Sequence, residues 1–221
     1  MNTLSKSLLA LALMALTASP ALAQRGGGGR GMMGGGSLGM LLANPGVQDE
    51  LKLTDDQKSK VTEVAEKVRD KQSSARESLQ NLEGQERFAK QRELTREANA
   101  EIQKGLADVL KPEQTARLKG IQYQAMGVAA FEDEELAKAL KLTDAQKSDI
   151  ASIARESMEK SREIFQNAGD DREGAMTKLR DLRKDSIAKA ESKLNAEQKA
   201  EYAKIIGAPF ELRFGRPGGN N

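Results

Sequence analysis

Apolar residues recur at steps of three and four along two consecutive stretches in the first half of the chain. The first stretch carries Val61, Ala65, Val68, Ala75, Leu79 and Leu82. The second carries Phe88, Leu94, Ala98, Ile102, Leu106 and Leu110. This spacing places apolar side chains on one face of an amphipathic helix. We expect a helix over residues 55–81 that ends near Gly84, and a second helix that packs along it, because a lone rod of roughly 40 Å is unstable in water.

The second half of the chain repeats this pattern. The first of its long helices is marked by Ile150, Ile153, Ala154, Ile164, Phe165 and Ala168. The returning helix is marked by Ala175, Leu179, Leu182, Ile187, Ala190 and Leu194. We expect a bend between Gly169 and Gly174, a short helix before Leu140, and a short helix after each hairpin, the first of them running from Pro112 to Gly127.

A nine-residue string occurs twice and ties the two halves together. Residues 51–59 read LKLTDDQKS and residues 140–148 read LKLTDAQKS, so eight of nine positions match at a separation of 142 − 53 = 89 residues. A weaker L-x-x-E-Q string begins at Leu110 and again at Leu194, a separation of 194 − 110 = 84 residues. The order strong, weak, strong, weak indicates a tandem duplication of one helical unit.

The strong string has the residues of a helix start. A threonine can accept from the backbone N–H three residues later, while the glutamine at that position accepts from the threonine N–H; this capping box is expected at Thr54 with Gln57 and at Thr143 with Gln146. In the weak copies Asn195 can cap with Gln198, whereas Lys111 cannot, and Pro112 provides a first-turn residue. Capping alone and capping combined with a further role are both consistent with the string.

The sequence divides into five segments. Residues 1–23 have one early charge, a short apolar run and an Ala-Leu-Ala ending, which is typical of a cleaved secretory signal. Residues 24–46 are Gly-rich and are expected to be disordered. Residues 47–131 and 132–212 form the two helical units, and 213–221 a flexible tail. The expected fold is all-α, with two tandem long helical hairpins, each with a short terminal helix, flanked by disordered Gly-rich arms.

Composition narrows the classes of function. The sequence contains no histidine or cysteine, and its formal net charge is +2. Zinc and copper sites usually draw on Cys and His, and the common nucleophilic mechanisms need a Cys nucleophile or a His base. The acidic clusters 132–135 and 170–171 stand at expected helix starts, where carboxylates are common anyway. We therefore expect no enzyme, no metal and no cofactor, and the nearly balanced charge disfavours nucleic acid as a partner.

The repeated strings resemble the LTxxQ family of bacterial periplasmic proteins, the Spy and CpxP kind. The family pattern is carried by Leu53, Thr54 and Gln57, by Leu142, Thr143 and Gln146, and partially by Leu110, Gln114, Leu194 and Gln198. The resemblance implies a small exported helical protein, a dimer forming a thin curved cradle, and ATP-independent chaperone or stress-signalling activity. Two departures are the presence of two units in one chain and the absence of the histidines with which metal-binding relatives hold zinc.

The resemblance implies a function in binding. We expect a periplasmic protein that holds unfolded clients with exposed apolar segments on an amphipathic helical surface, without nucleotide, without stable insertion into the membrane, and as a monomer or homodimer. The alternative is a structural or adaptor protein of the cell envelope whose helices pair with one fixed partner. An apolar surface left open after folding favours the first reading, and a seam closed by oligomerisation favours the second.

Overall fold

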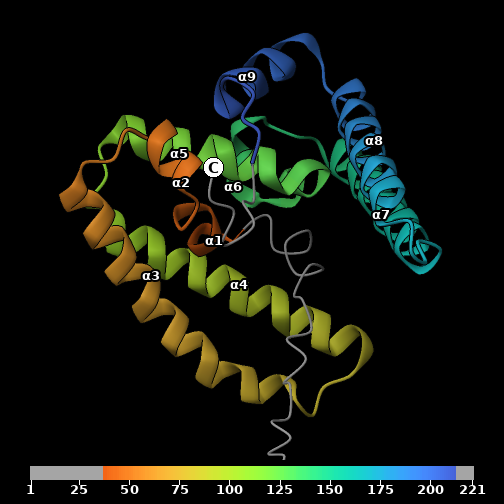
Figure 1. Ribbon diagram of the computed structural model, residues 1–221. Helices are drawn as coiled ribbons and strands as arrows, with labels where there is room; N and C mark the ends of the chain where they lie inside the picture. The colour runs from red at the N-terminus through yellow and green to blue at the C-terminus, as the bar shows by residue number, and fades with distance from the viewer. Residues whose placement is uncertain (1–36, 213–221) are drawn as a thin grey trace, which may run out of the picture.

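The computed structural model describes residues 37–212, and every regular element within them is helical, as predicted (Figure 1). The two longest pairs of helices are α3 with α4 and α7 with α8. In chain order the elements are α1 Leu38–Leu42, α2 Pro45–Glu50, α3 Asp55–Ala75, the 3-10 helix η1 Arg76–Leu79, α4 Gly84–Leu106, α5 Pro112–Met126, the 3-10 helix η2 Gly127–Glu132, α6 Glu134–Ala139, α7 Asp144–Gln166, α8 Arg172–Ser192 and α9 Ala196–Ile206.

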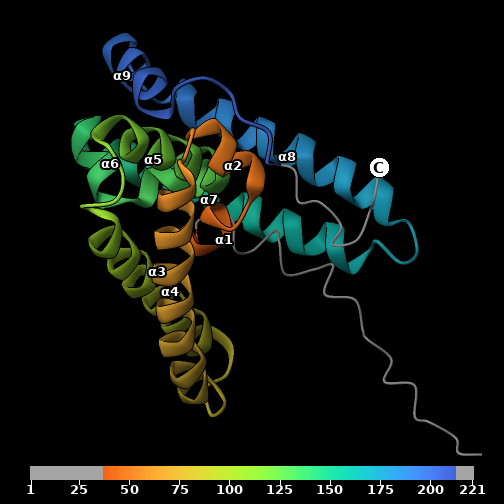
Figure 2. The same ribbon diagram turned by 60° about the vertical axis from the view of Figure 1, so that its left-hand side comes forward.

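Two arms extend from a common body. Helices α3 and α4 pack side by side as one arm, and α7 and α8 pack side by side as the other (Figures 1 and 2). The body contains α5 and α9, which contact each other, with η2 and α6 beside them. Helix α1 packs at the base of the first arm, against both α3 and α4. Each arm is thus a pair of long packed helices that joins the body at one end.

The end of the segment predicted to be disordered is helical. Residues 24–46 were expected to lack structure, but α1 lies within this range and α2 begins at Pro45. The high glycine content led the prediction to overlook a short apolar pattern. Its residues, Leu38, Leu41 and Leu42, are each only 1% exposed. The Leu38 N–H also donates to Asn99 Oδ1 on α4 at 2.9 Å. The rest of that segment, residues 24–36, lies outside the described residues, as do the expected signal 1–23 and tail 213–221.

The first arm differs from its prediction at the tip. Helix α3 ends at Ala75, not near residue 81, and continues as η1. Serine hydroxyls donate to carbonyls in this part, from Ser73 to Asp70 O at 2.7 Å and from Ser78 to Ala75 O at 2.6 Å. Such bonds compete with the helical ladder and bend helices. Phe88, which the pattern placed on the inner face of α4, is half exposed.

Two clusters of buried side chains hold the body together. The first cluster contains residues of α1 and α5 and of the bases of α3 and α4. The second contains residues of η2, α6 and α9 and of the bases of α7 and α8. Phe131 lies in the second cluster, with its ring centroid 4.8 Å from that of Tyr202. Phe210, beyond α9, packs back against the first cluster, and its N–H donates to Gln124 Oε1 at 2.8 Å. The last described residues therefore connect the two halves.

Helices α5 and α9 approach most closely at Gly120. A Cβ at this position would lie 2.6 Å from Ile206 O and 2.8 Å from Ile205 O, which are backbone atoms and cannot rotate away. Nearby, Gln124 Nε2 donates to Ile206 O at 2.7 Å and to Ala208 O at 2.9 Å. The carbonyls at the end of α9 are thus satisfied by α5, and only a glycine leaves room for this contact.

Gly120→Ala should therefore destabilise the protein, although alanine is the better helix former. We expect a loss of about 1–3 kcal/mol in the free energy of unfolding, the usual range for overpacking. Urea denaturation followed by circular dichroism measures this. The matched control is Gly39→Ala, whose added Cβ would meet Ile102 Cδ1 at an ordinary 3.5 Å. Equal stability of both variants would show that α5 and α9 separate easily.

Candidate functional site

The strong string spans a helix end, a tight turn and the next helix start. Lys52 ends α2 with φ of 50°, and Lys141 ends α6 with the same φ. The backbone N–H of Leu53 reaches Gln48 O at 3.1 Å, and that of Leu142 reaches Ala137 O at 3.0 Å. This is the Schellman arrangement, in which a left-handed residue closes a helix. The sequence reading found the helix starts but not the left-handed lysines before them.

The capping boxes expected from the sequence are present. Gln57 N–H donates to Thr54 Oγ1 at 3.3 Å, and Thr54 N–H donates to Gln57 Oε1 at 3.1 Å. The corresponding distances at Thr143 and Gln146 are 3.2 Å and 3.0 Å. Asn195 caps α9 in the same way with Gln198. Lys111 provides no side-chain cap, but its N–H still donates to Gln114 Oε1 at 2.9 Å.

The glutamines of the strong and weak strings also bond to each other, which the sequence reading did not foresee. Gln57 Nε2 lies 2.8 Å from Gln114 Oε1, and Gln114 Nε2 lies 3.1 Å from Gln57 Oε1. In the second half, Gln146 Nε2 lies 2.7 Å from Gln198 Oε1, with a return distance of 3.0 Å. Each pair is a reciprocal amide dimer that joins the start of a long helix to the start of a short one.

Every polar atom in these amide dimers has at least two partners. The second hydrogen of Gln57 Nε2 goes to Val109 O at 2.8 Å, and that of Gln114 Nε2 goes to Leu51 O at 3.0 Å. The second dimer bonds to Lys193 O and Leu140 O at 2.8 Å and 3.0 Å. Each Oε1 accepts from its partner amide and from its own N-cap backbone N–H. A primary amide has two donors and two lone pairs, so all four side chains are saturated.

The motif leucines are buried beside these dimers. Leu53 and Leu110 belong to the first cluster, and Leu142 and Leu194 belong to the second. All ten residues predicted from the strings therefore gather at two junctions between an arm and the body. None of the hydrogen-bonded side chains at the junctions is titratable. These side chains therefore orient the helices and do not transfer protons.

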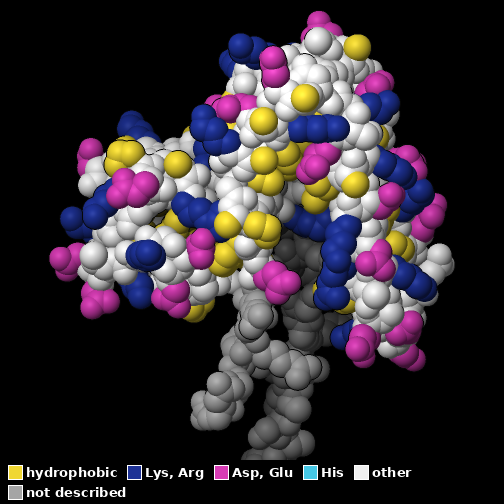
Figure 3. Space-filling view, turned by 90° about the horizontal axis from the view of Figure 1, so that it is seen from above, with side chains coloured by type: hydrophobic (Ala, Val, Ile, Leu, Met, Phe, Trp, Pro, Cys, Tyr) yellow, Lys and Arg dark blue, Asp and Glu magenta, His cyan; other side chains and the backbone are white. Residues whose placement is uncertain are grey.

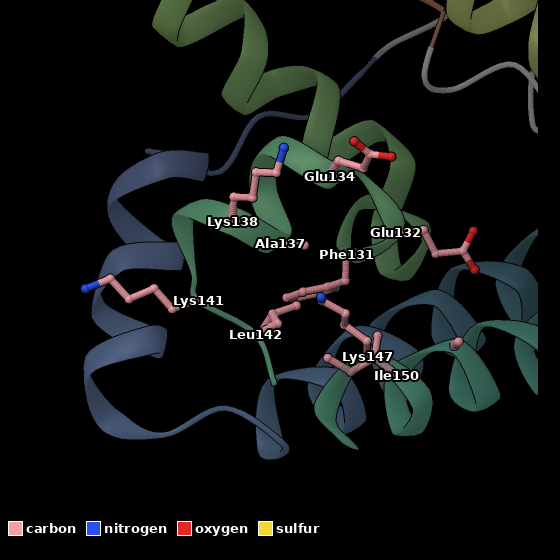
Figure 4. A pocket seen from close by; sticks show the side chains of 10 residues that line it. Phe131, Glu132, Glu134, Ala137, Lys138, Lys141, Leu142, Lys147 and Ile150 are labelled. Atoms are coloured by element: carbon pink, nitrogen blue, oxygen red, sulfur yellow. The ribbon is translucent and has the colours of Figure 1, made fainter. Parts of the chain in front are cut away.

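An open pocket lies beside the second junction, between α6 and α7. This α6–α7 pocket has a volume of about 570 Å³. Its floor is apolar and is formed by Phe131, Ala137, Leu142, Ile150 and Ala151. Its rim is charged and is formed by Glu132, Glu134, Lys138, Lys141 and Lys147. In Figure 4 the Lys147 side chain crosses the floor beside Phe131, and the other charged side chains project outward around it. No motif in the sequence marks this pocket.

The arms present large apolar side chains to solvent. Phe88 on α4, Met158 and Phe165 on α7, and Met176 on α8 are 50%, 53%, 46% and 48% exposed. The Arg162 guanidinium of the second arm lies 5.4 Å from the centre of the Phe88 ring on the first. Charged side chains of both signs are spread over the face of the molecule seen in Figure 3. The helical periodicity had assigned Phe88 and Phe165 to packed faces, and the structure corrects that assignment.

Two tyrosines are the residues whose acidity the fold changes most. Burial raises the pKa of Tyr202 to about 12. Burial and the neighbouring Asp133 carboxylate, which accepts from the Tyr123 hydroxyl at 3.0 Å, raise the pKa of Tyr123 as well. Both phenols thus stay protonated at neutral pH and serve packing and hydrogen bonding. Neither provides a base.

Within residues 37–212, no group of three or more His, Cys, Asp or Glu side chains could hold a metal ion. No helix in the same range is long and apolar enough to cross a bilayer. No family model, curated protein or solved structure matches the chain. The contacts described above are therefore the basis for any statement about function.

The capping role predicts a difference between two small substitutions. Thr143→Ala removes the oxygen that accepts from Gln146 N–H and should cost about 0.5–2 kcal/mol of unfolding free energy, because a helix N–H loses its cap. Thr143→Ser keeps that oxygen and should cost little. Chemical denaturation of both variants, and of the Thr54 pair, measures the difference. An equally large loss for serine would mean that the threonine methyl group, and not the cap, stabilises the junction.

The amide dimer predicts a pH-dependent defect for Gln198→Glu. A carboxylate cannot donate to Leu140 O or Gln146 Oε1, so we expect a loss of about 1–3 kcal/mol at neutral pH. Burial beside acceptors raises the pKa of the introduced acid above its unfolded value. The penalty is therefore present above that raised pKa and shrinks as the pH falls through it, because the protonated acid donates again.

Stability curves between acid and neutral pH test this expectation, with Gln91→Glu on the exposed side of α4 as the control. The control should stay within about 0.5 kcal/mol of the parent protein. A Gln198→Glu variant as stable as the control at neutral pH would show that the amide dimer does not hold the junction.

Proposed function

We propose that this chain is an exported, periplasmic binding protein of the LTxxQ kind, which holds exposed apolar segments of unfolded proteins on its two arms. It acts as an ATP-independent chaperone and catalyses no reaction. The proposal follows the resemblance carried by the two strong strings and is supported by the character of the arm surface. Export and the periplasmic location rest on residues 1–23 and stay predictions.

The observation that carries the proposal is where the exposed large apolar side chains lie. Among the described residues, four of the five such side chains are on the arms, and the fifth, Met40, is on α1. Three of the five are methionines, whose flexible and polarisable side chains adapt to many partners. Mixed charge surrounds them, which limits self-association. A surface of this kind suits weak binding of varied apolar segments.

Few side chains are buried along the arms, and those nearest the tips are Leu79 on η1 and Ala175 and Leu179 on α8. On α7 the buried residues are Ile150 and Ala154, both near the body, and no residue of 155–174 is buried. On α3 the buried residues are Val61 and Val68. Helices with few buried contacts open locally at low cost. Such arms can adjust to the shape of a client while the body stays folded.

We also propose that the chain contains two copies of one hairpin unit. Support comes from the strings at matched places, from the left-handed lysines that precede both caps, and from the two amide dimers. A shift of 89 residues aligns α2 with α6 and α3 with α7, and α1 falls on η2. The copies would then begin near residues 38 and 127, so α1 belongs to the first unit and η2 to the second.

Suppression of aggregation by the purified protein, without nucleotide, tests the function. We expect near-stoichiometric protection of several unrelated unfolding proteins. The double substitution Met158→Ser and Met176→Ser should weaken client binding by about tenfold, since burial of each side chain contributes to affinity. Met40→Ser is the matched control, because Met40 is exposed but lies on α1 and not on an arm.

The two readings of the function predict different results in this assay. Protection that is unaffected by the arm substitutions would remove the arms from the proposal. No protection of any client, together with tight binding of one envelope protein, would replace the chaperone with an adaptor. Circular dichroism of each variant confirms that the helices are intact.

A further inference from the structure

The two junctions differ on one face, between the helix that precedes the strong string and the helix that follows it. At the first junction Gln48 Nε2 donates to Leu42 O at 2.7 Å, so a long side chain fills this face. Beside it, Lys58 Nζ lies 3.8 Å from Asp49 Oδ1. The face is filled and its charges are paired.

The same positions at the second junction carry different residues. A shift of 89 residues places Ala137 where Gln48 stands, Lys138 where Asp49 stands, and Lys147 where Lys58 stands. The glutamine that fills the first face is thus a methyl group in the second, and an ion pair becomes two lysines. The residues at these three positions, Ala137, Lys138 and Lys147, all line the α6–α7 pocket.

The exchanges give up stabilising contacts. Truncating a filling side chain removes packing, and two like charges stand where the first junction has the Lys58–Asp49 ion pair. The positive charges of the two lysines are only partly compensated. Lys147 Nζ lies 3.4 Å from Asp144 Oδ1, and Glu132 and Glu134 lie on the rim. Departures from a locally favourable arrangement are expected at functional sites.

We propose that the α6–α7 pocket binds a short segment of a client protein in which a large apolar side chain lies next to a carboxylate. The apolar side chain enters over Phe131, Leu142 and Ile150, and the carboxylate pairs with the ammonium groups of Lys138 and Lys147. A volume of about 570 Å³ lies within the usual range for ligand sites. This inference rests on the proposed function, and it specifies which clients are preferred.

Fluorescence anisotropy with three short labelled peptides tests the preference. In the first peptide Leu-Phe is flanked by Asp and Glu, in the second the acids are replaced by Lys, and in the third Leu-Phe is replaced by Ser-Ser. The first should bind best. Ala137→Gln, which restores the filling side chain of the first junction, should weaken its binding by roughly 10- to 100-fold. Equal binding of all three peptides, or an unchanged affinity in Ala137→Gln, overturns the proposal.

The charge requirement has its own variant and control. Lys138→Asp recreates the ion pair of the first junction and should weaken binding of the acidic peptide by about two- to fivefold, with no loss for the Lys peptide. Lys178→Asp makes the same change in net charge on α8, away from the pocket, and should leave both affinities unchanged. Equal effects of the two variants would show that only overall charge matters, which overturns the assignment to Lys138.

The first junction offers a gain of binding. Gln48→Ala combined with Asp49→Lys should open the equivalent face and raise the number of acidic peptides bound from one to two per chain. A folded variant that still binds one peptide overturns the assignment to these positions.

Decanoate is a further probe. If it shifts the methyl NMR signals of Ala137 and Ile150 while the acidic peptide does not, the pocket takes small amphiphiles and not protein segments.

Failure of this inference is separable from failure of the proposed function. Aggregation assays on clients that lack acidic-apolar segments report on the arms alone, and Ala137→Gln should not change them. Protection of such clients with no peptide binding at the pocket leaves the function standing and removes the pocket. Peptide binding at the pocket without protection of any client leaves a segment-binding protein that is not a general chaperone.

Discussion

The structure depends on a reciprocal hydrogen bond between two glutamine amides at the base of each arm. Each amide caps its own helix, contacts its partner amide and donates to a carbonyl in the turn that precedes its partner's helix. One side chain therefore sets the start of a helix and its position against another. Because amides are neutral, this constraint does not depend on protonation and is little screened by salt, unlike the exposed ion pairs on the arms.

The features that sequence reasoning found are those with a local physical cause. The long helices follow from the spacing of apolar residues, and the caps follow from a threonine or asparagine three residues before a glutamine. The amide dimers join positions separated by 57 and 52 residues, and no local pattern indicates that two capping glutamines meet. The one signal available in the sequence was that these glutamines stand at the same place in repeated strings. This signal does not indicate that their side chains contact each other.

Other differences follow from tertiary contacts. The Gly-rich composition before residue 46 concealed three leucines that the first cluster buries. Phe88 and Phe165 fit the helical period, yet both lie near an arm tip and are about half exposed. The α6–α7 pocket lies beside the small side chain of Ala137, and an alanine in a helix has no distinctive signature in a sequence. Comparison of the two junctions, not periodicity, makes it visible.

The attachment of each arm at one end has a mechanical consequence. Helix α7 has 23 residues, so the tip of its arm lies roughly 35 Å from the amide dimer at its base. At that leverage, a rotation of about 5° at the junction moves the tip by roughly 3 Å, comparable to the width of a side chain. The separation of the arm tips, where Arg162 lies over the Phe88 ring, therefore responds to small changes in the hydrogen bonds at the base of the arm. A single glutamine amide at the base of an arm therefore controls how far apart the two arms lie.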